Sequence, residues 1–175
     1  MIPIKTILHP TDFSKPSEYA LRFACALARD YQARLLLLHV VEPPVYYGEL
    51  GMAVPLPADF HESLYQRLSR RVPVECGILV ETILVEGNAS QQILRVAEEH
   101  HCDLIILGTH ARTGLSRVLL GSVAEDVIRH SRFPVLTLKT PTLLDATASE
   151  SAEACAVVAR QAGKKPSRSV LVIQP

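Results

Sequence analysis

The 175-residue sequence has no excess of charge of either sign, because 18 lysine and arginine residues balance 18 aspartate and glutamate residues. Without a net charge, the protein has no overall field that would draw it to nucleic acid or to an anionic membrane. No apolar run approaches the roughly 20 residues needed to cross a bilayer, and the apolar start, Met1 to Leu8, is too short for a secretory signal. These absences predict a soluble protein that binds neither nucleic acid nor membrane.

The cysteines lack the spacing of a metal site or a disulfide framework. No C-x-x-C pair occurs among them, and they are scattered through apolar segments as Cys25, Cys76, Cys102 and Cys155. This pattern is typical of reduced thiols and predicts a cytoplasmic protein. The run His100-His101-Cys102 offers three potential zinc ligands. A zinc site is nevertheless not expected there, because adjacent side chains at a helix end do not easily converge on one ion and no second pair has ligand spacing.

Apolar runs and helical patterns alternate along the chain. With 48% hydrophobic and 21% charged residues, the composition is that of a globular protein, and the length suits one domain. The expected strands are Lys5–His9, Arg34–Val41, Ile78–Val85, Leu104–Leu107 and Pro134–Lys139. Helices are expected from Ser14 to Tyr31, Ala58 to Arg71, Asn88 to His100 and Val123 to His130, with Ser14 and Asn88 as the N-caps of the first and the third.

Five strands alternating with four helices predict an α/β fold with a doubly wound, five-stranded parallel sheet, because each parallel step needs a right-handed crossover. Arg34–Val41 is nearly all apolar without alternation, which indicates a central strand covered on both faces. His9 and His39 lie on such strands and are expected to be satisfied core or pocket-wall residues. Ligands in such sheets bind at the carboxyl ends of strands where the strand order reverses.

Residues 140–175 differ from the rest of the chain. Ala152 to Ala162 has the pattern of a small-residue helix, and Ser169 to Ile173 has the pattern of a strand. The sequence leaves two structures open for this extension: one further α-β unit, or a tail that pairs with a neighbouring edge strand.

The segment from Gly108 to Glu125 follows a strand and opens a helix, which is where an anion is best held by free backbone N–H groups and the helix dipole. Gly108, Gly114 and Gly121 let the backbone approach a ligand, and Thr109 and Ser122 offer hydroxyls. The segment is neither a P-loop nor a G-x-G-x-x-G fingerprint. Ser122 and Glu125 also have the spacing of a capping box, so the residue types alone leave a purely structural function open.

This segment resembles the universal stress protein signature G-x2-G-x9-G-[ST], with Gly108 first, Ala111 in place of the second glycine, and Gly121-Ser122 closing it. Three flanking segments resemble the same family: Thr6 to Ser14, Leu38 to Val41 and Phe133 to Leu136. The resemblance covers residues 1–139 and leaves 140–175 as a C-terminal extension.

The resemblance implies the adenine nucleotide alpha hydrolase-like fold, with ATP or AMP lying across the ends of the first and fourth strands. Pro10 and Asp12 would flank the nucleoside and Val40 would meet adenine through its backbone. Asp12 would also help to place Mg²⁺, although it could equally be a turn residue. The expected nucleotide-binding residues are Pro10, Thr11, Asp12, Val40, Gly108, Thr109, His110, Ala111, Arg112, Gly114, Gly121, Ser122 and Val123.

Ala111 is the departure from the signature that bears on affinity. Its methyl group stands where the backbone would approach phosphate, and Ala resists positive φ at a cost of roughly 1 kcal/mol or more. We expect binding to be retained but weakened or shifted toward AMP or ADP. Arg112 and Arg117 could neutralise phosphate charge or be ordinary solvated surface, and the same choice applies to His110.

The resemblance implies a nucleotide-dependent signalling module that forms a homodimer through the strand Pro134–Lys139, an edge that would otherwise be unpaired. Ala111 favours a second function, a dimeric stress protein that acts through protein contacts without nucleotide. A third is an enzyme on the same kind of sheet, at most a slow ATPase, since the segment from His9 to Asp12 is not the H-x-G-H motif of nucleotidyltransferases and no side chain stands out as a base.

Overall fold

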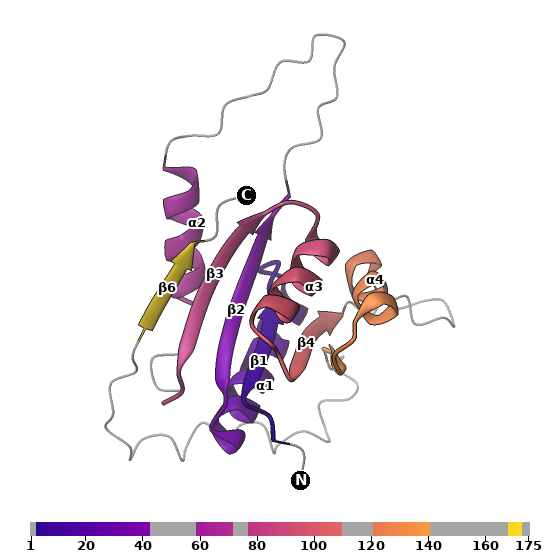
Figure 1. Cartoon of the computed structure of the whole chain (residues 1–175). Coiled ribbons are helices and arrows are strands. Elements are labelled where there is room, and N and C mark those ends of the chain that lie inside the picture. Colours follow the sequence, from indigo (N-terminus) through magenta and orange to yellow (C-terminus); the bar gives the residue numbers. More distant parts are fainter. Residues whose placement is uncertain (1–2, 43–58, 72–76, 110–120, 141–167, 173–175) are drawn as a thin grey trace.

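The computed structural model describes residues 3–42, 59–71, 77–109, 121–140 and 168–172. Strands and helices alternate within these ranges, so that the five predicted strands and the four predicted helices are all confirmed (Figure 1). A sixth strand follows near the C-terminus. The elements are β1 (Thr6–Pro10), α1 (Lys15–Tyr31), β2 (Arg34–Val41), α2 (Phe60–Ser69), β3 (Val80–Glu86), α3 (Ala89–Glu99), β4 (Leu104–Thr109), α4 (Ser122–His130), β5 (Val135–Lys139) and β6 (Arg168–Val172).

The strands form one parallel sheet with the order β5-β4-β1-β2-β3-β6. Helices α1 and α2 pack on one face and α3 and α4 on the other, which is the predicted doubly wound arrangement (Figure 1). The chain runs outward from β1 through β2 to β3, and then returns to the other side of β1 for β4 and β5. This reversal places a topological switch point between β1 and β4.

The strand-like pattern near the C-terminus forms β6, which pairs in parallel with β3. It therefore lies at the edge of the sheet opposite β5 (Figure 1). Within the described ranges, no strand of the same chain covers the outer edge of β5. The helix-like stretch from Ala152 to Ala162 lies outside the described residues.

Two of the helices begin at the side-chain caps that the sequence predicts. Ser14 caps α1 by accepting a hydrogen bond from the N–H of Ser17 at 3.3 Å. Asn88 caps α3 by accepting one from the N–H of Gln91 at 3.1 Å. Each cap satisfies one of the backbone donors that a helix leaves unpaired in its first turn.

Ser122 and Glu125 do not form the capping box that their spacing left open. Gly121 is the N-cap and has no side chain to serve as one, whereas Ser122 is the first residue inside the helix. A capping serine must stand outside the helix with extended backbone, so Ser122 is one position too late. The Glu125 side chain instead accepts a hydrogen bond from Arg129 at 2.9 Å.

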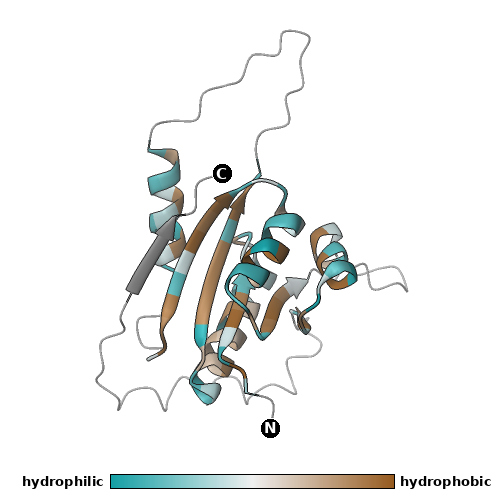
Figure 2. Ribbon diagram, in the orientation of Figure 1, coloured by the Kyte–Doolittle hydropathy of each residue, from teal (hydrophilic) through white to brown (hydrophobic). Residues whose placement is uncertain are grey.

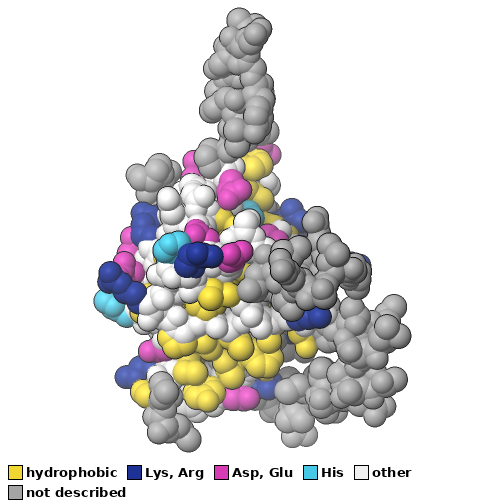
Figure 3. All heavy atoms as spheres, turned by 90° about the vertical axis from the view of Figure 1, so that its right-hand side faces the viewer, with side chains coloured by type: hydrophobic (Ala, Val, Ile, Leu, Met, Phe, Trp, Pro, Cys, Tyr) yellow, Lys and Arg dark blue, Asp and Glu magenta, His cyan; other side chains and the backbone are white. Residues whose placement is uncertain are grey.

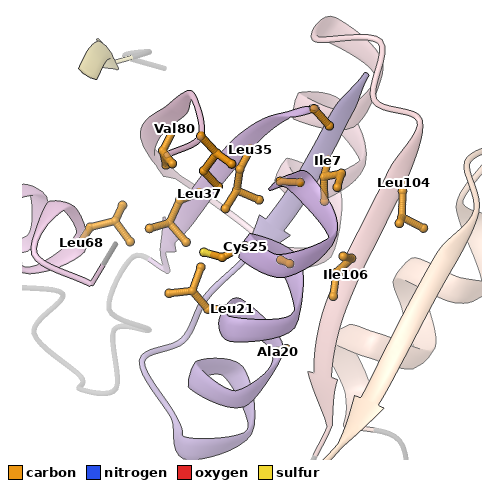
Figure 4. Close-up of a cluster of buried hydrophobic side chains, with 14 residues drawn as sticks. Ile7, Ala20, Leu21, Cys25, Leu35, Leu37, Leu68, Val80, Leu104 and Ile106 are labelled. Carbon is orange, nitrogen blue, oxygen red and sulfur yellow. The ribbon is translucent and has the colours of Figure 1, made fainter. Parts of the chain in front are cut away.

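The core divides into two clusters because successive strand side chains point to opposite faces of the sheet. Figure 4 shows the cluster beneath α1, in which Ile7, Leu35 and Ile106 of three neighbouring strands meet Leu21 and Cys25 of the helix. The other cluster lies beneath α3 and α4, and its buried members are Leu8, Leu36, Leu38, Ile83, Val85, Ile93, Val96, Ala97, Cys102, Ile105, Leu107, Ala124 and Val127. Figure 2 shows that hydrophobic residues predominate in the central strands, whereas the helices alternate hydrophilic and hydrophobic residues.

The outer strand β5 is less covered than the central strands. Its residues Val135 to Leu138 are half-buried, whereas Leu35 to Leu38 of β2 are fully buried. Figure 3 views the molecule from the side of β4 and α4 and shows hydrophobic side chains gathered across the lower part of that face. An apolar edge with unpaired backbone groups is a surface that proteins usually cover.

Candidate functional site

The sheet opens at the switch point between β1 and β4. These strands pair at only two positions, the second of which is Leu8 opposite Ile105, whereas β1 pairs with β2 at five. Past this point the carbonyl of Ile106 accepts a hydrogen bond from the side chain of His9, with 2.8 Å between Nδ1 and the oxygen. The strands thus separate at their carboxyl ends, where open α/β sheets bind ligands.

A cavity of about 400 Å³ lies at this opening, between the strand ends and helices α1, α3 and α4. Nine of the predicted site residues line it: Pro10, Thr11, Asp12, Val40, Gly108, Thr109, Gly121, Ser122 and Val123. The other predicted residues, His110, Ala111, Arg112 and Gly114, lie outside the described residues, as does Arg117.

Sequence reasoning missed six residues of the lining: Ser17, Glu42, Ala89, Ile93, Leu107 and Ala124. Glu42 directly follows β2 and Ala89 begins α3, so both occupy the carboxyl edge of the sheet where a ligand was already expected. Inspecting the end of every strand, and not only those in the family signature, would have found them. Ile93 and Ala124 reach the cavity from further along their helices, and only the packing reveals them.

Polar groups of His9, Ser17 and Thr11, the first two of them buried, close the α1 side of the opening. The ring of His9 is fully buried, with Nδ1 donating to Ile106 and Nε2 lying 3.5 Å from the hydroxyl of Ser17. Ser17 donates to the hydroxyl oxygen of Thr11 at 2.8 Å, and that oxygen also accepts the N–H of Phe13 at 3.1 Å. Burial lowers the pKa of His9 to about 4, against the opposing effect of its hydrogen bonds. His9 is therefore neutral at pH 7 and is a satisfied core residue, as predicted.

A tight turn carries Asp12 to the cavity. The Asp12 carboxylate accepts a hydrogen bond from the N–H of Ser14 at 2.9 Å, which is the turn function that the sequence left open. Phe13 has a φ of 63°, a left-handed conformation that a bulky residue rarely adopts. Its ring centroid lies 4.4 Å from that of His39 and 4.2 Å from the guanidinium carbon of Arg67. Contacts on the ring hold this strained turn in place.

His39 ties the end of β2 to the same turn. Its Nδ1 donates to the carbonyl of Thr11 at 2.7 Å. Burial lowers the pKa of His39, and the positive charge of Arg67 acts in the same direction. A neutral ring with its proton on Nδ1 fits this hydrogen bond, so His39 supports the wall of the site as predicted.

Two glycines of the cavity have different physical reasons for lacking a side chain. A Cβ on Gly108 would lie 2.3 Å from the carbonyl oxygen of Pro16 and 2.6 Å from the nitrogen of Ser17. Gly108 is therefore required by the close approach of β4 to the first turn of α1. A Cβ on Gly121 would meet no described atom within 4 Å, and the φ of −58° suits any residue. Of the two glycines, only Gly121 has space beside its main chain among the described residues.

The main chain of Val40 faces the opening. The N–H of Arg34 and the carbonyl of Leu38 both bond toward the β1 side, so the even-numbered residues of β2 direct their main-chain groups that way. The last partner on β1 is Pro10, opposite Leu38. The N–H and C=O of Val40 therefore point into the space past the end of β1, one donor beside one acceptor.

The first turns of two helices reach the cavity and differ in their partners. At α4 no side chain caps the first turn, since the N-cap is Gly121. At α3 the cap is Asn88, and the Glu42 carboxylate also accepts a long hydrogen bond of 3.4 Å from the N–H of Ala89. The α3 end of the cavity thus already holds a negative charge, whereas no side chain of the described residues caps the first N–H groups of α4.

The model of the universal stress protein family matches residues 3–139. This chain belongs to the universal stress protein family. Among curated members, Universal stress protein MJ0531 from Methanocaldococcus jannaschii is 34% identical over 148 residues, which is 78% of this chain and 83% of that protein. Universal stress protein YxiE from Bacillus subtilis is 32% identical, over 73% of this chain and 94% of its own length.

Solved structures agree with the fold of this universal stress protein. Protein MJ0577 of Methanocaldococcus jannaschii superposes with a TM-score of 0.64 at 30% identity, covering 81% of this chain and 99% of that one. A universal stress protein solved in complex with cAMP has a TM-score of 0.58 at 23% identity, covering 80% of this chain and all of the other. The predicted five-stranded α/β fold is confirmed by both.

Metal-binding residues do not cluster in the described part of this universal stress protein: no group of three or more His, Cys, Asp and Glu side chains there is close enough to hold an ion. Cys25 and Cys102 are buried and form no disulfide, and burial raises the pKa of Cys102 to about 12, which keeps it a thiol. Cys76 and Cys155 lie outside the described residues. No helix in the described ranges is both long enough and apolar enough to pass through a bilayer.

Proposed function

We propose that this universal stress protein binds an adenine nucleotide, ATP or AMP, across the carboxyl ends of β1, β2 and β4, and acts as a nucleotide-dependent signalling module of the cytoplasm. The observation that carries the proposal is the cavity at the switch point, which joins the main chain of Val40 on one side to the uncapped turn of α4 on the other. Its volume of about 400 Å³ suits a small-molecule ligand. The related fold solved with cAMP supports the same ligand class.

The residues present fit the parts of such a ligand. The N–H and C=O of Val40 match the ring nitrogen and the amino group on the hydrogen-bonding edge of adenine, and Ile93 supplies an apolar wall. The backbone N–H groups at Ser122 and Val123 suit phosphate oxygens, because the helix dipole adds to their attraction. Gly121 leaves room beside the main chain for the phosphates to approach.

Asp12 is suited to the sugar and to a cation. One of its carboxylate oxygens is used by the turn, which leaves the other for ribose hydroxyls or for Mg²⁺. Mg²⁺ in nucleotide sites is commonly bound by phosphates and only one or two carboxylates. Asp12 would therefore hold the cation together with the nucleotide rather than before it.

Titration of the full chain with ATP, ADP and AMP tests this proposal. A ligand present at about 100 times its dissociation constant stabilises the folded protein by roughly 2.7 kcal/mol, so a clear rise in melting temperature is expected. No heat of binding and no thermal shift with any of the three nucleotides at millimolar concentration would contradict the proposal.

Variants of Gly121 separate binding from folding. Gly121→Asp adds a good N-cap residue, so stability should be kept or slightly raised, while the new carboxylate repels phosphate. We expect ATP affinity to fall at least tenfold, because the carboxylate competes with the phosphate for the N–H groups of α4 and such charge-assisted hydrogen bonds are strong. Gly121→Asn is the matched control, with the same size and capping ability but no charge, and it should lose less. If Gly121→Asp and Gly121→Asn bind ATP with equal affinity, the phosphates do not lie at the start of α4.

We also propose a homodimer formed by antiparallel pairing of β5 with its own copy. The N–H of Ile105 donates to the carbonyl of Pro134, so the even-numbered residues of β5 direct their main-chain groups toward β4. The N–H and C=O of Thr137 therefore point outward, away from β4. Thr137→Pro would remove only an outward N–H, and proline is tolerated on edge strands.

Light scattering on the full chain tests the dimer. We expect a dimer for the wild type and for Thr137→Val, which keeps the N–H, and a monomer for Thr137→Pro with a similar melting temperature. A wild-type monomer at concentrations on the order of tens of micromolar would contradict the proposal, because dimers are governed by mass action.

The alternative is a dimeric stress protein that acts through protein contacts without nucleotide, and the observation that favours it is Ala111 in the signature. Ala111→Gly should tighten ATP binding if the substitution weakens an existing site. Absence of binding in both the wild type and Ala111→Gly would favour the alternative.

A further inference from the structure

The two ends of the cavity differ in charge, and the difference is made by Glu42. Both α3 and α4 direct their first turns at the cavity, so either helix could in principle attract phosphate. At α3, however, Asn88 accepts the N–H of Gln91 and the Glu42 carboxylate accepts that of Ala89. A second anion there would face Glu42, so the phosphates belong at α4 and the base belongs at the Glu42 end.

The position of Glu42 follows from the alternation of side chains between the two faces of the sheet along β2. Val40 packs toward the α3 face, and two residues on, Glu42 lies on the same side and reaches the first residue of α3. Glu42 and Val40 both line the cavity, so a base that meets the main chain of Val40 lies beside the carboxylate. Only one oxygen of Glu42 is used by Ala89, over a long distance of 3.4 Å, which leaves the other available.

We propose that Glu42 is a specificity-determining residue that selects purines with an amino group at position 6 over those with a carbonyl there. This inference rests on the proposed nucleotide site. A carboxylate only accepts hydrogen bonds. An amino group has two hydrogens, one for the carbonyl of Val40 and one for Glu42, whereas a carbonyl oxygen in its place would face a negative charge with no proton between them.

The test compares ATP with ITP, which differ at position 6 of the purine and share the same sugar and phosphates. Wild-type protein should bind ATP about tenfold more tightly than ITP, the scale expected for a hydrogen bond to a charged group. Glu42→Gln should lower the ratio several-fold by raising affinity for ITP, because glutamine has the same shape, keeps an acceptor for Ala89 and adds an N–H donor. Part of the preference for ATP should remain, because the N–H and C=O of Val40 still match adenine and not the N–H and carbonyl of the ITP base.

The matched control is Glu86→Gln, which changes an exposed carboxylate at the end of the next strand that pairs with His61 at 2.9 Å and does not line the cavity. This variant should keep the wild-type ratio of affinities. Asp12→Asn removes the carboxylate that is proposed to hold the ribose or Mg²⁺, which ATP and ITP share. It should therefore weaken the binding of both nucleotides by a similar factor. Melting temperatures without ligand identify any variant that is misfolded.

The outcomes separate this inference from the proposed function. If ATP and ITP bind equally well to the wild type, or if Glu42→Gln leaves their ratio unchanged, the assignment to Glu42 is wrong while the nucleotide site stands. If the wild type binds neither nucleotide, both the proposed function and the assignment are overturned.

Discussion

The two sides of the opening at the strand ends are built on different physical principles. On the α1 side, Gly108 packs against backbone, the buried ring of His9 donates to the carbonyl of Ile106, and the buried hydroxyl of Ser17 donates to Thr11. On the α3 and α4 side, the lining residues Gly121 and Ser122 are exposed, and one helix begins without a side-chain cap. The closed side holds the strands in place, and the open side is free to meet a ligand.

The comparison changes how the glycine-rich signature is understood. Gly108 and Gly121 belong to the same sequence motif, yet the first lacks a side chain because of α1 and the second leaves space beside the cavity. A glycine of a binding motif can therefore be required by the packing of the fold. Substitutions on the closed side should affect stability, and those on the open side should affect binding.

The largest effect is expected for Gly108→Ala. Its Cβ would meet the backbone of Pro16, which cannot rotate away as a side chain can, so we expect the free energy of unfolding to fall by about 4 kcal/mol. Gly121→Ala is the control and should cost less than about 1 kcal/mol, since it alters only an N-cap. Urea denaturation measures both, and similar losses in the two variants would abolish the distinction between the sides.

The second effect concerns the pH dependence that His9 confers. Its folded pKa of about 4 lies below the ordinary value of 6.5, so the unfolded chain takes up the proton first as pH falls. The stabilising contribution is complete above pH 6.5 and is lost between pH 6.5 and about 4, by up to about 3 kcal/mol.

His9→Asn isolates this contribution, because asparagine does not ionise and keeps an N–H that can donate to Ile106. The variant should be less stable at neutral pH and should show a flatter decline between pH 6.5 and 4 than the wild type, as measured by unfolding at a series of pH values. Parallel curves for the two proteins would show that His9 is not the buried neutral ring that closes this side.

The smallest effect is expected from a pair of serines, one on each side. Ser17→Ala removes a buried hydroxyl that donates to Thr11 and should cost about 1 kcal/mol of stability. Ser122→Ala changes an exposed first-turn residue and should alter stability by less than about 0.5 kcal/mol while weakening ATP binding. The reverse order of stability losses would contradict the assignment of the sides.

Most of the fold could be predicted because its signals are local. The nearly all-apolar run Arg34–Val41 predicted a central strand, and the polar residue Asn88 before an amphipathic stretch predicted a helix cap. The alternative of a cap at Ser122 is not observed, because the spacing of a serine and a glutamate does not reveal which residue is the last outside the helix. The pairing of β6 with β3 depends on contacts distant in sequence, so its pattern predicted a strand but not a partner.

The site was predictable only in part for a similar reason. Residues of the signature and of the first strand end were found from the motif, whereas Glu42 has no motif and is identified by the contact of its carboxylate with α3. Gly108 was predicted to lie at the cavity, but the reason for its being glycine depends on how closely α1 approaches β4. Such distances are set by packing and cannot be read from residue types.

The early end of pairing between β1 and β4 has a consequence for how such a protein changes over evolutionary time. The cavity exists because two main chains diverge after Leu8 and Ile105, and no side chain has to be removed to create it. Residues that line the cavity, such as Glu42, can therefore be substituted without rebuilding the scaffold that creates it. A recess that is set by the divergence of two strands does not depend on any one side chain, so the same architecture can accommodate ligands of different chemistry.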